Sequence, residues 1–524
     1  MMLPRVPYVR FPPAAFYLLL GVIALWPVFA VPVPGLGDYL NHLARIHVIT
    51  TLHHSPALQQ FYELRWGFAP YLGMDAVLSL LVQVMPIYQA GRVFVALCVL
   101  MPVIAAVALR AAAQRRVGLL PAATFLLCYN YMLSWGFLNY LFCAGLALLL
   151  FAGWIATTHW SRWPRAALFA AGLLLVYLGH VFACAVYCIA VAAFEIAAAL
   201  RVRFRPPRRM ALTWLAAASQ IVPALCLAVF FNLKEAVPGP STSFYGDLGA
   251  KLRALLSPVL FPGDGASSAA AICVALLVGL YLWRHGHFRL DQNLWPAAAA
   301  MAAVGAVVPY VLFSTWGTDL RLPIIAVVLF IAGLSHAAPL SRAGRAVLLA
   351  ALVCLCIAKS IQTESIFQKV NGQVNDIRQL VAALPLGARL LVIELDDPDA
   401  PLRVAHFTTT IHIPMVAVID RDAFEPSLFT GLTLVHTRAA MTMSSSPGAP
   451  PIGLSALRDG LTHKDQADAP AFFNFGARIY WYDWPDKFDD VLIMHFGDPT
   501  PGLPPMLHRI ATSPIADLYR IGHP

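Results

Sequence analysis

The chain has 524 residues, of which 59% are hydrophobic and only 12% are charged, and its formal net charge is +9. Soluble globular proteins carry about 25% charged residues, so this composition excludes them and predicts a polytopic membrane protein. The positive charge does not indicate nucleic-acid binding, because the arginines lie in short clusters between apolar runs, the pattern of membrane orientation.

The first apolar run extends from about Phe16 to Val33, close to the roughly 20 residues that a transmembrane helix needs. Arg5 and Arg10 precede it, and the Val31-Pro32-Val33-Pro34 stretch at its end is a poor signal-peptidase site. We therefore expect an uncleaved first helix with a cytoplasmic N-terminus.

Polar residues are concentrated directly after this run, in Gly35-Leu36-Gly37-Asp38-Tyr39-Leu40-Asn41-His42-Leu43-Ala44-Arg45. Lipid contact cannot offset the desolvation of such groups at a membrane exit, so the cluster indicates a function. In a helix that begins at Tyr39, Asp38, His42 and Arg45 share one face. The carboxylate could then act as a general base while the guanidinium holds an anionic substrate group. The alternative is that Asp38 only caps the helix.

Further apolar runs lie at residues 71–86, 89–109, 118–134, 138–157, 166–179, 181–200, 211–232, 268–283, 294–313, 320–338 and 344–358. Cations gather between them, at Arg110/Arg115/Arg116, Arg162/Arg165, Arg201/Arg203/Arg205/Arg208/Arg209, Arg284/Arg289 and Arg342/Arg345. All nine cysteines lie inside apolar runs and suggest no disulfide framework.

The positive-inside rule favours a cytoplasmic position for the five clusters, which places the hairpin tips between them on the outer side with Asp38. These tips are Met132–Tyr140, Gly179-His180, Asn232–Ser267 and Ser314–Arg321. The chain must then cross once between Tyr71 and Leu109, so we expect residues 71–86 to form a short re-entrant or peripheral helix. The alternative is that one cluster breaks the rule. The expected total is about 11 or 12 membrane helices.

A second polar group, Ser314-Thr315-Trp316-Gly317-Thr318-Asp319-Leu320-Arg321-Leu322-Pro323, lies at the outer mouth of a late helix. An outward arginine departs from the positive-inside trend, and its planar fork matches a phosphate in two hydrogen bonds. We interpret Arg321 as a phosphate ligand oriented by Asp319. A capping aspartate beside an interfacial arginine is the alternative.

Other polar residues of the outer tips are candidates for substrate contact, namely His180, Asn139 and, in the first loop, Asn41. The alternatives are a histidine that bonds a helix end and an interfacial aromatic belt around Asn139. A cofactor is not assigned: a divalent metal is left open, and no ligand spacing supports one, because His53-His54 lacks a third ligand.

From Lys359 onward, charge and proline increase and no run reaches the length of a span. An amphipathic helix is predicted at Asn375–Leu384, buried strands at Ala388–Leu395 and Asp490–Phe496, and an edge strand at Ala516–Ile521. The sequence therefore predicts a multi-pass membrane domain in residues 1–358 and a non-cytoplasmic α/β or α+β domain in residues 359–524.

The layout resembles the GT-C superfamily, integral membrane glycosyltransferases that take a sugar from a polyprenyl-phosphate carrier on the non-cytoplasmic face. The resembling features are Asp38 in the first outer loop, amphipathic helices after it, Arg321-Leu322-Pro323 at a late helix and the C-terminal outer domain. Many members carry paired acids in the first loop, whereas the next acid in this loop is Glu63.

The resemblance implies a bacterial inner-membrane enzyme that uses an undecaprenyl-phosphate-like sugar donor and an unknown acceptor at the periplasmic face. Asp38 would activate the acceptor hydroxyl, His42 would orient Asp38, and Arg321 with Arg45 would neutralise the leaving phosphate. Two other classes stay open: a lipid-linked glycan flippase or other transporter, and a non-catalytic component of an envelope assembly complex. Transporters place ionisable groups near mid-membrane, and here only Asp75 and Glu195 interrupt the runs.

Overall fold

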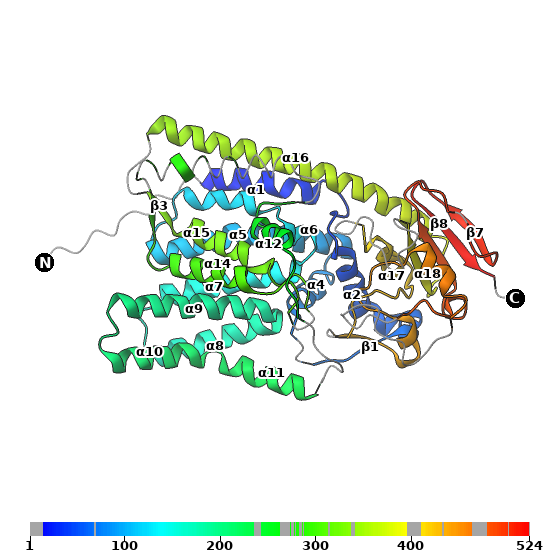
Figure 1. Cartoon of the computed structure of the whole chain (residues 1–524), viewed down its shortest axis with the longest axis horizontal. Coiled ribbons are helices and arrows are strands. Elements are labelled where there is room, and N and C mark those ends of the chain that lie inside the picture. Colours follow the sequence, from blue (N-terminus) through cyan, green and yellow to red (C-terminus); the bar gives the residue numbers. More distant parts are fainter. Residues whose placement is uncertain are drawn as a thin grey trace.

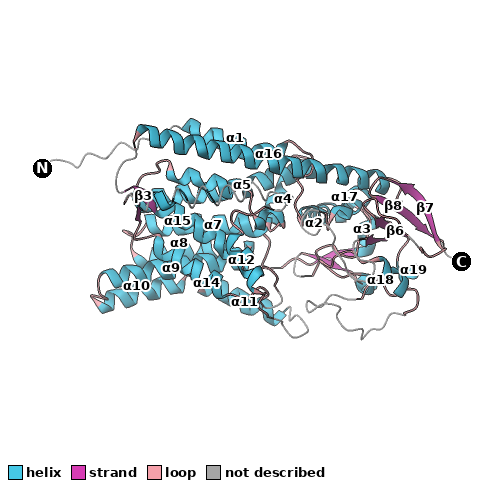
Figure 2. Cartoon of the chain, turned by 45° about the horizontal axis from the view of Figure 1, so that its top comes forward, coloured by secondary structure: helices cyan, strands magenta, loops and turns pink. Residues whose placement is uncertain are grey.

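A computed structural model describes residues 14–67, 70–234, 243–261, 273, 277, 279–281, 284, 286, 288–312, 315–336, 341–395, 410–431, 434–463, 479–500 and 502–522. The chain forms a helical bundle that adjoins a smaller region of helices and strands at one end (Figure 1). In Figure 2 the strands gather near the C-terminus, apart from a short pair that includes β3 at the far end of the bundle.

The bundle is built from long apolar helices. They are α1 (Ala14–Phe29), α5 (Ile87–Gln114), α7 (Leu138–Ala156), α8 (Arg162–Gly179), α9 (Val181–Arg201), α10 (Pro207–Ser219), α11 (Val222–Lys234), α14 (Trp295–Val307), α15 (Arg321–Gly333) and α16 (Arg342–Val381). Within the described residues, α5, α7, α9, α10 with α11, and α16 provide 5 helices long and apolar enough to cross a membrane, and α1, α14 and α15 are shorter apolar helices. The total of 11 or 12 stays a prediction, since much of 262–287 lies outside the described residues.

The segment 71–86 contains only the short helix α4 (Gly73–Leu81). At 1.5 Å per residue this helix is about 14 Å long, whereas a bilayer core is about 30 Å thick. The expectation of a short helix that does not cross the membrane agrees with this length.

The run 118–134 was expected to be an apolar membrane helix, and this is wrong. It forms the 3₁₀ helix η2 (Leu120–Leu127) and one turn of α-helix, α6 (Tyr131–Ser134). The segment nevertheless follows α1 from end to end: the Tyr17 hydroxyl donates to the Gly118 carbonyl at 3.0 Å and the Tyr129 hydroxyl to the Ala24 carbonyl at 2.6 Å. It therefore returns the chain to the end of the bundle where α1 stops.

Irregular backbone among membrane helices needs partners from the protein itself. Lys359 of α16 is buried against this segment, and its ammonium group donates to the carbonyls of Leu126 at 3.3 Å and Val259 at 2.9 Å. The Asn130 side chain caps α6 by accepting from the Leu133 amide at 3.0 Å. These bonds satisfy polar groups that an α-helix would have paired internally.

The C-terminal sheet contains β4 (Leu390–Glu394), β6 (Asp490–Met494), β7 (Leu507–Thr512) and β8 (Ala516–Ile521) in the order β4-β6-β8-β7. β4 and β6 are parallel and buried throughout, as their apolar sequences predict. The expectation that Ala516–Ile521 is an edge strand is wrong: β8 lies between β6 and β7, both antiparallel to it. The more exposed β7 takes the edge, because its outward residues are polar and tolerate water.

Helix α16 links the bundle to this region. It contains 40 residues, about 60 Å of helix, and the predicted boundary between residues 358 and 359 falls inside it. Phe367, Val370, Val374 and Ile377 follow a helical period and are buried, so the helix packs beyond the bundle on the C-terminal side. We refer to residues 382–522 as the C-terminal region.

The first loop packs on the C-terminal region. It consists of α2 (Tyr39–Thr51), η1 (Leu52–His54), α3 (Pro56–Phe61) and β1 (Tyr62–Leu64), and β1 pairs antiparallel with β5 (Val435–Thr437). α2 also lies against α17 (Val416–Arg421), and His47 pairs with Asp422 at 2.7 Å. The first loop and the C-terminal region therefore form one layer over the end of the bundle.

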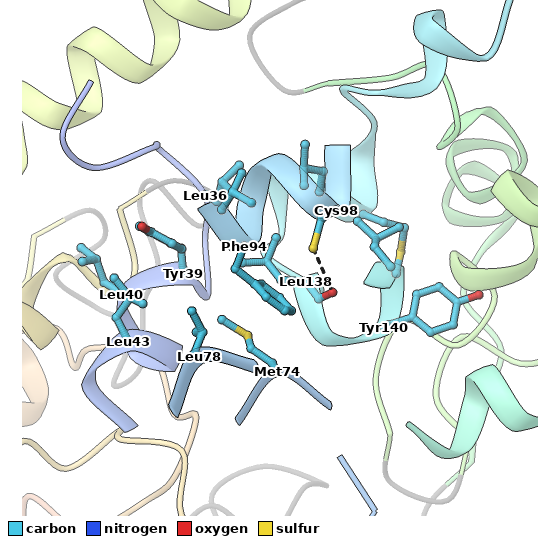
Figure 3. Packing of buried hydrophobic residues seen from close by; sticks show 14 of the residues in the cluster. Leu36, Tyr39, Leu40, Leu43, Met74, Leu78, Phe94, Cys98, Leu138 and Tyr140 are labelled. Carbon is cyan, nitrogen blue, oxygen red and sulfur yellow. Dashed lines mark hydrogen bonds between the residues drawn. The ribbon is translucent and has the colours of Figure 1, made fainter. Parts of the chain in front are cut away.

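Apolar side chains join that layer to the bundle (Figure 3). Leu36, Tyr39, Leu40 and Leu43 from the first loop lie with Met74 and Leu78 of α4 and Phe94 and Cys98 of α5, and all are buried. This contact fixes the start of α2 relative to the ends of the membrane helices, which positions the polar residues described next.

Candidate functional site

Residues at the starts of α2, α7, α9 and α15 meet at the end of the bundle that faces the C-terminal region. Between them lies a cavity of ≈ 310 Å³, and its lining combines charged groups, histidines and aromatic rings. The lining residues are Asp38, His42, Arg45, Tyr71, Phe137, Asn139, Tyr140, His180, Arg321, Phe429, Thr430, Pro447 and Gly448. The structure thus brings Asp38, His42, Arg45, Asn139, His180 and Arg321 together, but not Asn41 or Asp319.

Asp38 occupies the N-cap position of α2, yet its side chain makes no capping hydrogen bond. The carboxylate lines the cavity with 19% of the side chain exposed, and its Oδ1 atom lies 3.5 Å from Nε2 of His412. The alternative of a simple capping aspartate therefore lacks the bond that would define it.

The backbone around Asp38 depends on Gly136. Gly136 has φ +82, in the left-handed region, and a Cβ on it would lie 2.6 Å from the Asp38 amide nitrogen. The adjoining Trp135 carbonyl accepts a hydrogen bond from that amide at 3.0 Å. Only glycine allows the 131–137 turn to approach so closely and hold the start of α2.

His42 lies one turn after Asp38, half-buried in the cavity wall. Burial, together with nearby Arg45 and His412, holds the pKa of His42 well below its ordinary value, so the ring is neutral near pH 7. Its ring packs on Phe429 at 5.2 Å between centroids, and its Nδ1 has no hydrogen-bond partner within the described chain.

Arg321 is the first residue of α15 and is buried. Its guanidinium carbon lies 4.6 to 5.3 Å from the ring centroids of Phe137, Tyr140 and Phe182. One nitrogen donates to the Trp316 carbonyl at 3.2 Å, but no carboxylate of the described residues pairs with the group and its Nε has no partner among them. The cation is thus held by aromatic faces, and Asp38 of the same cavity acts on it through space without a direct ion pair in the described chain.

Arg45 contrasts with Arg321. Its guanidinium donates to Asp75 Oδ1 at 2.6 Å, and both side chains are almost fully buried. The second carboxylate oxygen of Asp75 has no hydrogen-bond partner in the described part of the chain. Arg45 is therefore already neutralised by a residue that the sequence analysis did not select for the site.

His180 caps α9, since its Nδ1 accepts from the Phe182 amide at 3.2 Å. Its other nitrogen lies 3.4 Å from Arg321, and its ring packs edge-on against Tyr71 and Tyr140. His180 thus bonds a helix end, as the alternative interpretation held, and also lines the cavity.

Asn139 lines the cavity with an amide that is fully engaged. Its Nδ2 donates to the carbonyls of Tyr71 and Gly179, both at 3.0 Å, and its Oδ1 accepts from the Met74 amide at 2.9 Å. These bonds hold the start of α4 and the end of α8 against α7, which is a structural role.

Asn41 was predicted to contact substrate, and the structure places it outside the cavity. Its Oδ1 accepts from the Phe429 amide at 2.8 Å, and its Nδ2 donates to the Ser427 carbonyl at 3.0 Å and lies 3.2 Å from His412 Nδ1. On α2, Asn41 lies on the side that faces the C-terminal region, so it binds that region instead.

Asp319 was predicted to orient Arg321, and the structure shows no bond between them. Asp319 is buried outside the cavity lining and pairs with Lys251 of α12 (Leu248–Leu256) at 3.3 Å. Asp319 lies two positions before Arg321, which is the first residue of α15. The two side chains therefore leave the turn in different directions.

Two residues of the C-terminal region were not predicted: Phe429 lines the cavity, and His412 lies against Asp38. His412 is buried and lies 371 positions from its partner Asn41. No spacing or motif links residues so distant, so the sequence offered no signal for them. Within the described residues, no group of three or more His, Cys, Asp or Glu side chains is arranged to hold a metal ion.

No family model matches the chain, and no curated protein matches it in sequence. Solved structures that are similar to it include ArnT from Cupriavidus metallidurans bound to undecaprenyl phosphate, with 12% identity, coverage of 97% of this chain and 98% of that chain, and a TM-score of 0.53. ArnT in the apo state gives 12% identity, 97% coverage of both chains and a TM-score of 0.52. At this identity the likeness shows the fold: the chain is a membrane protein with the GT-C fold that the sequence predicts, including the C-terminal region.

Proposed function

We propose that this protein is a glycosyltransferase of a bacterial inner membrane that transfers a sugar from a polyprenyl-phosphate carrier to an acceptor at the periplasmic face. Two findings support the proposal. The ArnT structure of the same fold holds undecaprenyl phosphate, and the cavity of this chain combines a carboxylate, aromatic walls and a buried cation. The sugar and the acceptor are not assigned.

The observation that carries the proposal is the buried Arg321 without a carboxylate partner among the described residues. A buried charge without a direct ion pair costs free energy, so a site that keeps one is suited to a ligand of opposite charge. The starts of α7, α9 and α15 add positive helix-dipole ends at the same place. A phosphate monoanion or dianion fits this environment, and the Arg321 fork can hold two of its oxygens.

In the proposed reaction Asp38 accepts the proton of the acceptor hydroxyl. The hydroxyl oxygen forms a bond to the anomeric carbon of the sugar, and the bond from that carbon to the phosphate oxygen breaks. The electron pair remains on the phosphate, whose growing charge Arg321 stabilises. Neutral His42 lines the same cavity and can hydrogen-bond the acceptor or sugar, while Arg45 is retained by Asp75.

The distribution of arginines supports the outward orientation. Arg115 ends α5, Arg162 begins α8, Arg201 ends α9 and Arg342 begins α16, all at the end of the bundle opposite the cavity. By the positive-inside rule we expect that end to be cytoplasmic, and the proposal then has the cavity and the C-terminal region in the periplasm.

Binding of undecaprenyl phosphate to the protein in nanodiscs tests the role of Arg321. Arg321→Lys keeps the charge but loses the fork, so we expect Kd to rise about 10-fold, and about 100-fold for Arg321→Ala, the range for charge-assisted hydrogen bonds. Arg342→Ala, at the exposed start of α16, serves as the control and should bind like the unmutated protein. Equal binding by all four proteins would remove Arg321 from the site and with it most of the case for a phosphate-linked donor.

A further inference from the structure

A chain of polar contacts connects the C-terminal region to the proposed base. Asn41 lies beside Nδ1 of His412 at 3.2 Å, and Nε2 of His412 lies 3.5 Å from Oδ1 of Asp38. His412 is buried, with 2% of its side chain exposed. Its ring packs edge-on against Phe429 at 5.3 Å, and Phe429 in turn contacts His42. The imidazole therefore has one orientation available and two polar neighbours.

The backbone determines which way the Asn41 amide points. The Phe429 amide can only donate, so the Asn41 atom 2.8 Å away must be the oxygen. The Ser427 carbonyl can only accept, so the atom 3.0 Å from it must be the Asn41 nitrogen. The positions of the Asn41 amide oxygen and nitrogen are thus assigned from two backbone partners whose donor and acceptor roles are fixed.

This orientation determines the protonation of His412. The Asn41 nitrogen only donates, so the facing Nδ1 of His412 must accept and carries no proton. A doubly protonated ring would place two donors against each other at that point. The proton of the ring is therefore on Nε2, the nitrogen that faces Asp38.

We propose that His412 is a positioning residue that holds the Asp38 carboxylate through its Nε2 proton, with Asn41 locking the ring in this tautomer. This deepens the proposed function and rests on it for the role of Asp38. Asp38 has no capping bond to the amides of α2, so His412 supplies the restraint that a capping bond would otherwise give. The C-terminal region would then complete the site, because the restraint comes from the 410–431 segment.

Three substitutions separate positioning from packing. His412→Gln keeps a nitrogen donor near the Nε2 position, His412→Asn keeps an acceptor near Nδ1 for Asn41, and His412→Phe keeps only the ring volume. We expect kcat to fall about 10- to 100-fold in the Asn and Phe variants, the effect of a misplaced reacting group, and much less in the Gln variant. KM for the lipid-linked donor should not change, since Arg321 is untouched.

A residue that only packs and bonds Asn41 would give the opposite order, with His412→Asn more active than His412→Gln. That order, or a rise in KM with kcat unchanged, would overturn the proposal. Thermal unfolding of the three variants identifies any loss that comes from misfolding, and the comparison of Gln with Asn stays valid because both side chains are polar amides.

A second measurement does not depend on transfer activity. In protein with ¹⁵N-labelled histidine, with His412→Gln identifying the signal, nitrogen chemical shifts should show Nδ1 unprotonated and Nε2 protonated. The Nε2 signal should shift in Asp38→Asn and not in Asp459→Asn, an exposed control. A protonated Nδ1, or no response to Asp38→Asn, would overturn the contact itself. If the contact is confirmed but Asp38→Asn keeps full activity, the proposed function fails at Asp38 and the positioning role fails with it.

Discussion

At the scale of single residues, the cavity contains two buried arginines in different electrostatic states. Arg45 is neutralised by Asp75 at 2.6 Å, whereas Arg321 rests on aromatic rings without a carboxylate among the described residues. Removing the carboxylate from a buried ion pair leaves its cation buried without a partner. An anion that binds beside a buried, unpaired cation has the opposite effect, because it neutralises that charge. Arg321 is therefore the residue at which an anionic ligand gains most.

The carboxyl group of Glu425 should make the free energy of unfolding depend on pH. Burial raises its pKa from 4.5 to about 7, so between these values the folded form holds a proton that the unfolded chain releases. Stability then falls as pH rises through this window, by about 3 kcal/mol in total, and is lowest above pH 7. Glu425→Gln should lack this contribution, so thermal unfolding at pH 5 and pH 8 should show a smaller loss with pH in the variant.

Glu364→Gln, which changes a half-buried carboxyl on α16, is the matched control. It gives the pH profile of a protein that lacks one carboxyl elsewhere in the chain. An identical profile for Glu425→Gln would mean that this carboxyl is ionised in the folded protein. The Glu425 oxygens accept from the amide and hydroxyl of Ser427, whose carbonyl holds Asn41, so the titration acts on the segment that reaches the cavity.

At the scale of elements, the turn that carries Gly136 determines where α2 begins. In Gly136→Ala the new methyl group would lie 2.6 Å from the Asp38 amide at a φ of +82, so the turn or the start of α2 must move. We expect activity to fall at least about 10-fold while the protein remains folded, since displacing a reacting group by 1 Å can cost 100-fold. Transfer assays and thermal unfolding on the same preparations check this.

Gly372→Ala in α16 is the control for that substitution. Its Cβ would meet nothing within 4 Å, and alanine is favoured over glycine in a helix by about 1 kcal/mol. It should therefore keep activity and gain slightly in stability. Full activity in Gly136→Ala would show that the close approach to Asp38 is not needed for the reaction.

The sequence predicts helices and strands well where a segment is continuously apolar. The runs at α5, α7 and α9 and the strands β4 and β6 have continuous apolar sequence, and each forms as expected. The run 118–134 is equally apolar, but it becomes 3₁₀ because Lys359 and α1 supply partners that no local pattern reveals. β8 was misplaced for a similar reason: the position of a strand in a sheet depends on β7, a polar strand without a clear alternation.

At the scale of the whole molecule, the site residues that sequence identified are polar residues next to the ends of apolar runs, where they are conspicuous. Asp38, His42 and Arg321 belong to this class, and all three line the cavity. Two residues it missed, His412 and Phe429, come from the C-terminal region, which packs back on the first loop. Their approach follows from the tertiary arrangement of α2, β1 and β5, and single-sequence patterns do not contain it.

The orientation in the membrane gives a whole-molecule prediction. Reporter fusions after Arg209 should give a cytoplasmic signal, and fusions after Pro524 a periplasmic one, because the arginine clusters lie at the end of the bundle opposite the cavity. Alkaline phosphatase and fluorescent-protein fusions measure the two sides. A cytoplasmic signal from the C-terminal fusion would overturn the proposed side of the reaction.

The central claim is that the cavity transfers a sugar with Asp38 as the base. Its most direct test is the consumption of polyprenyl-phosphate-linked sugar in membranes that contain either the unmutated protein or Asp38→Asn. Asparagine retains the size of the side chain but cannot accept a proton, so transfer should fall by about 10² to 10⁴. Binding of undecaprenyl phosphate and thermal stability should stay unchanged, and Asp459→Asn should remain fully active. Near-full transfer by Asp38→Asn, or movement of the lipid-linked sugar across the membrane without its consumption, would contradict the account.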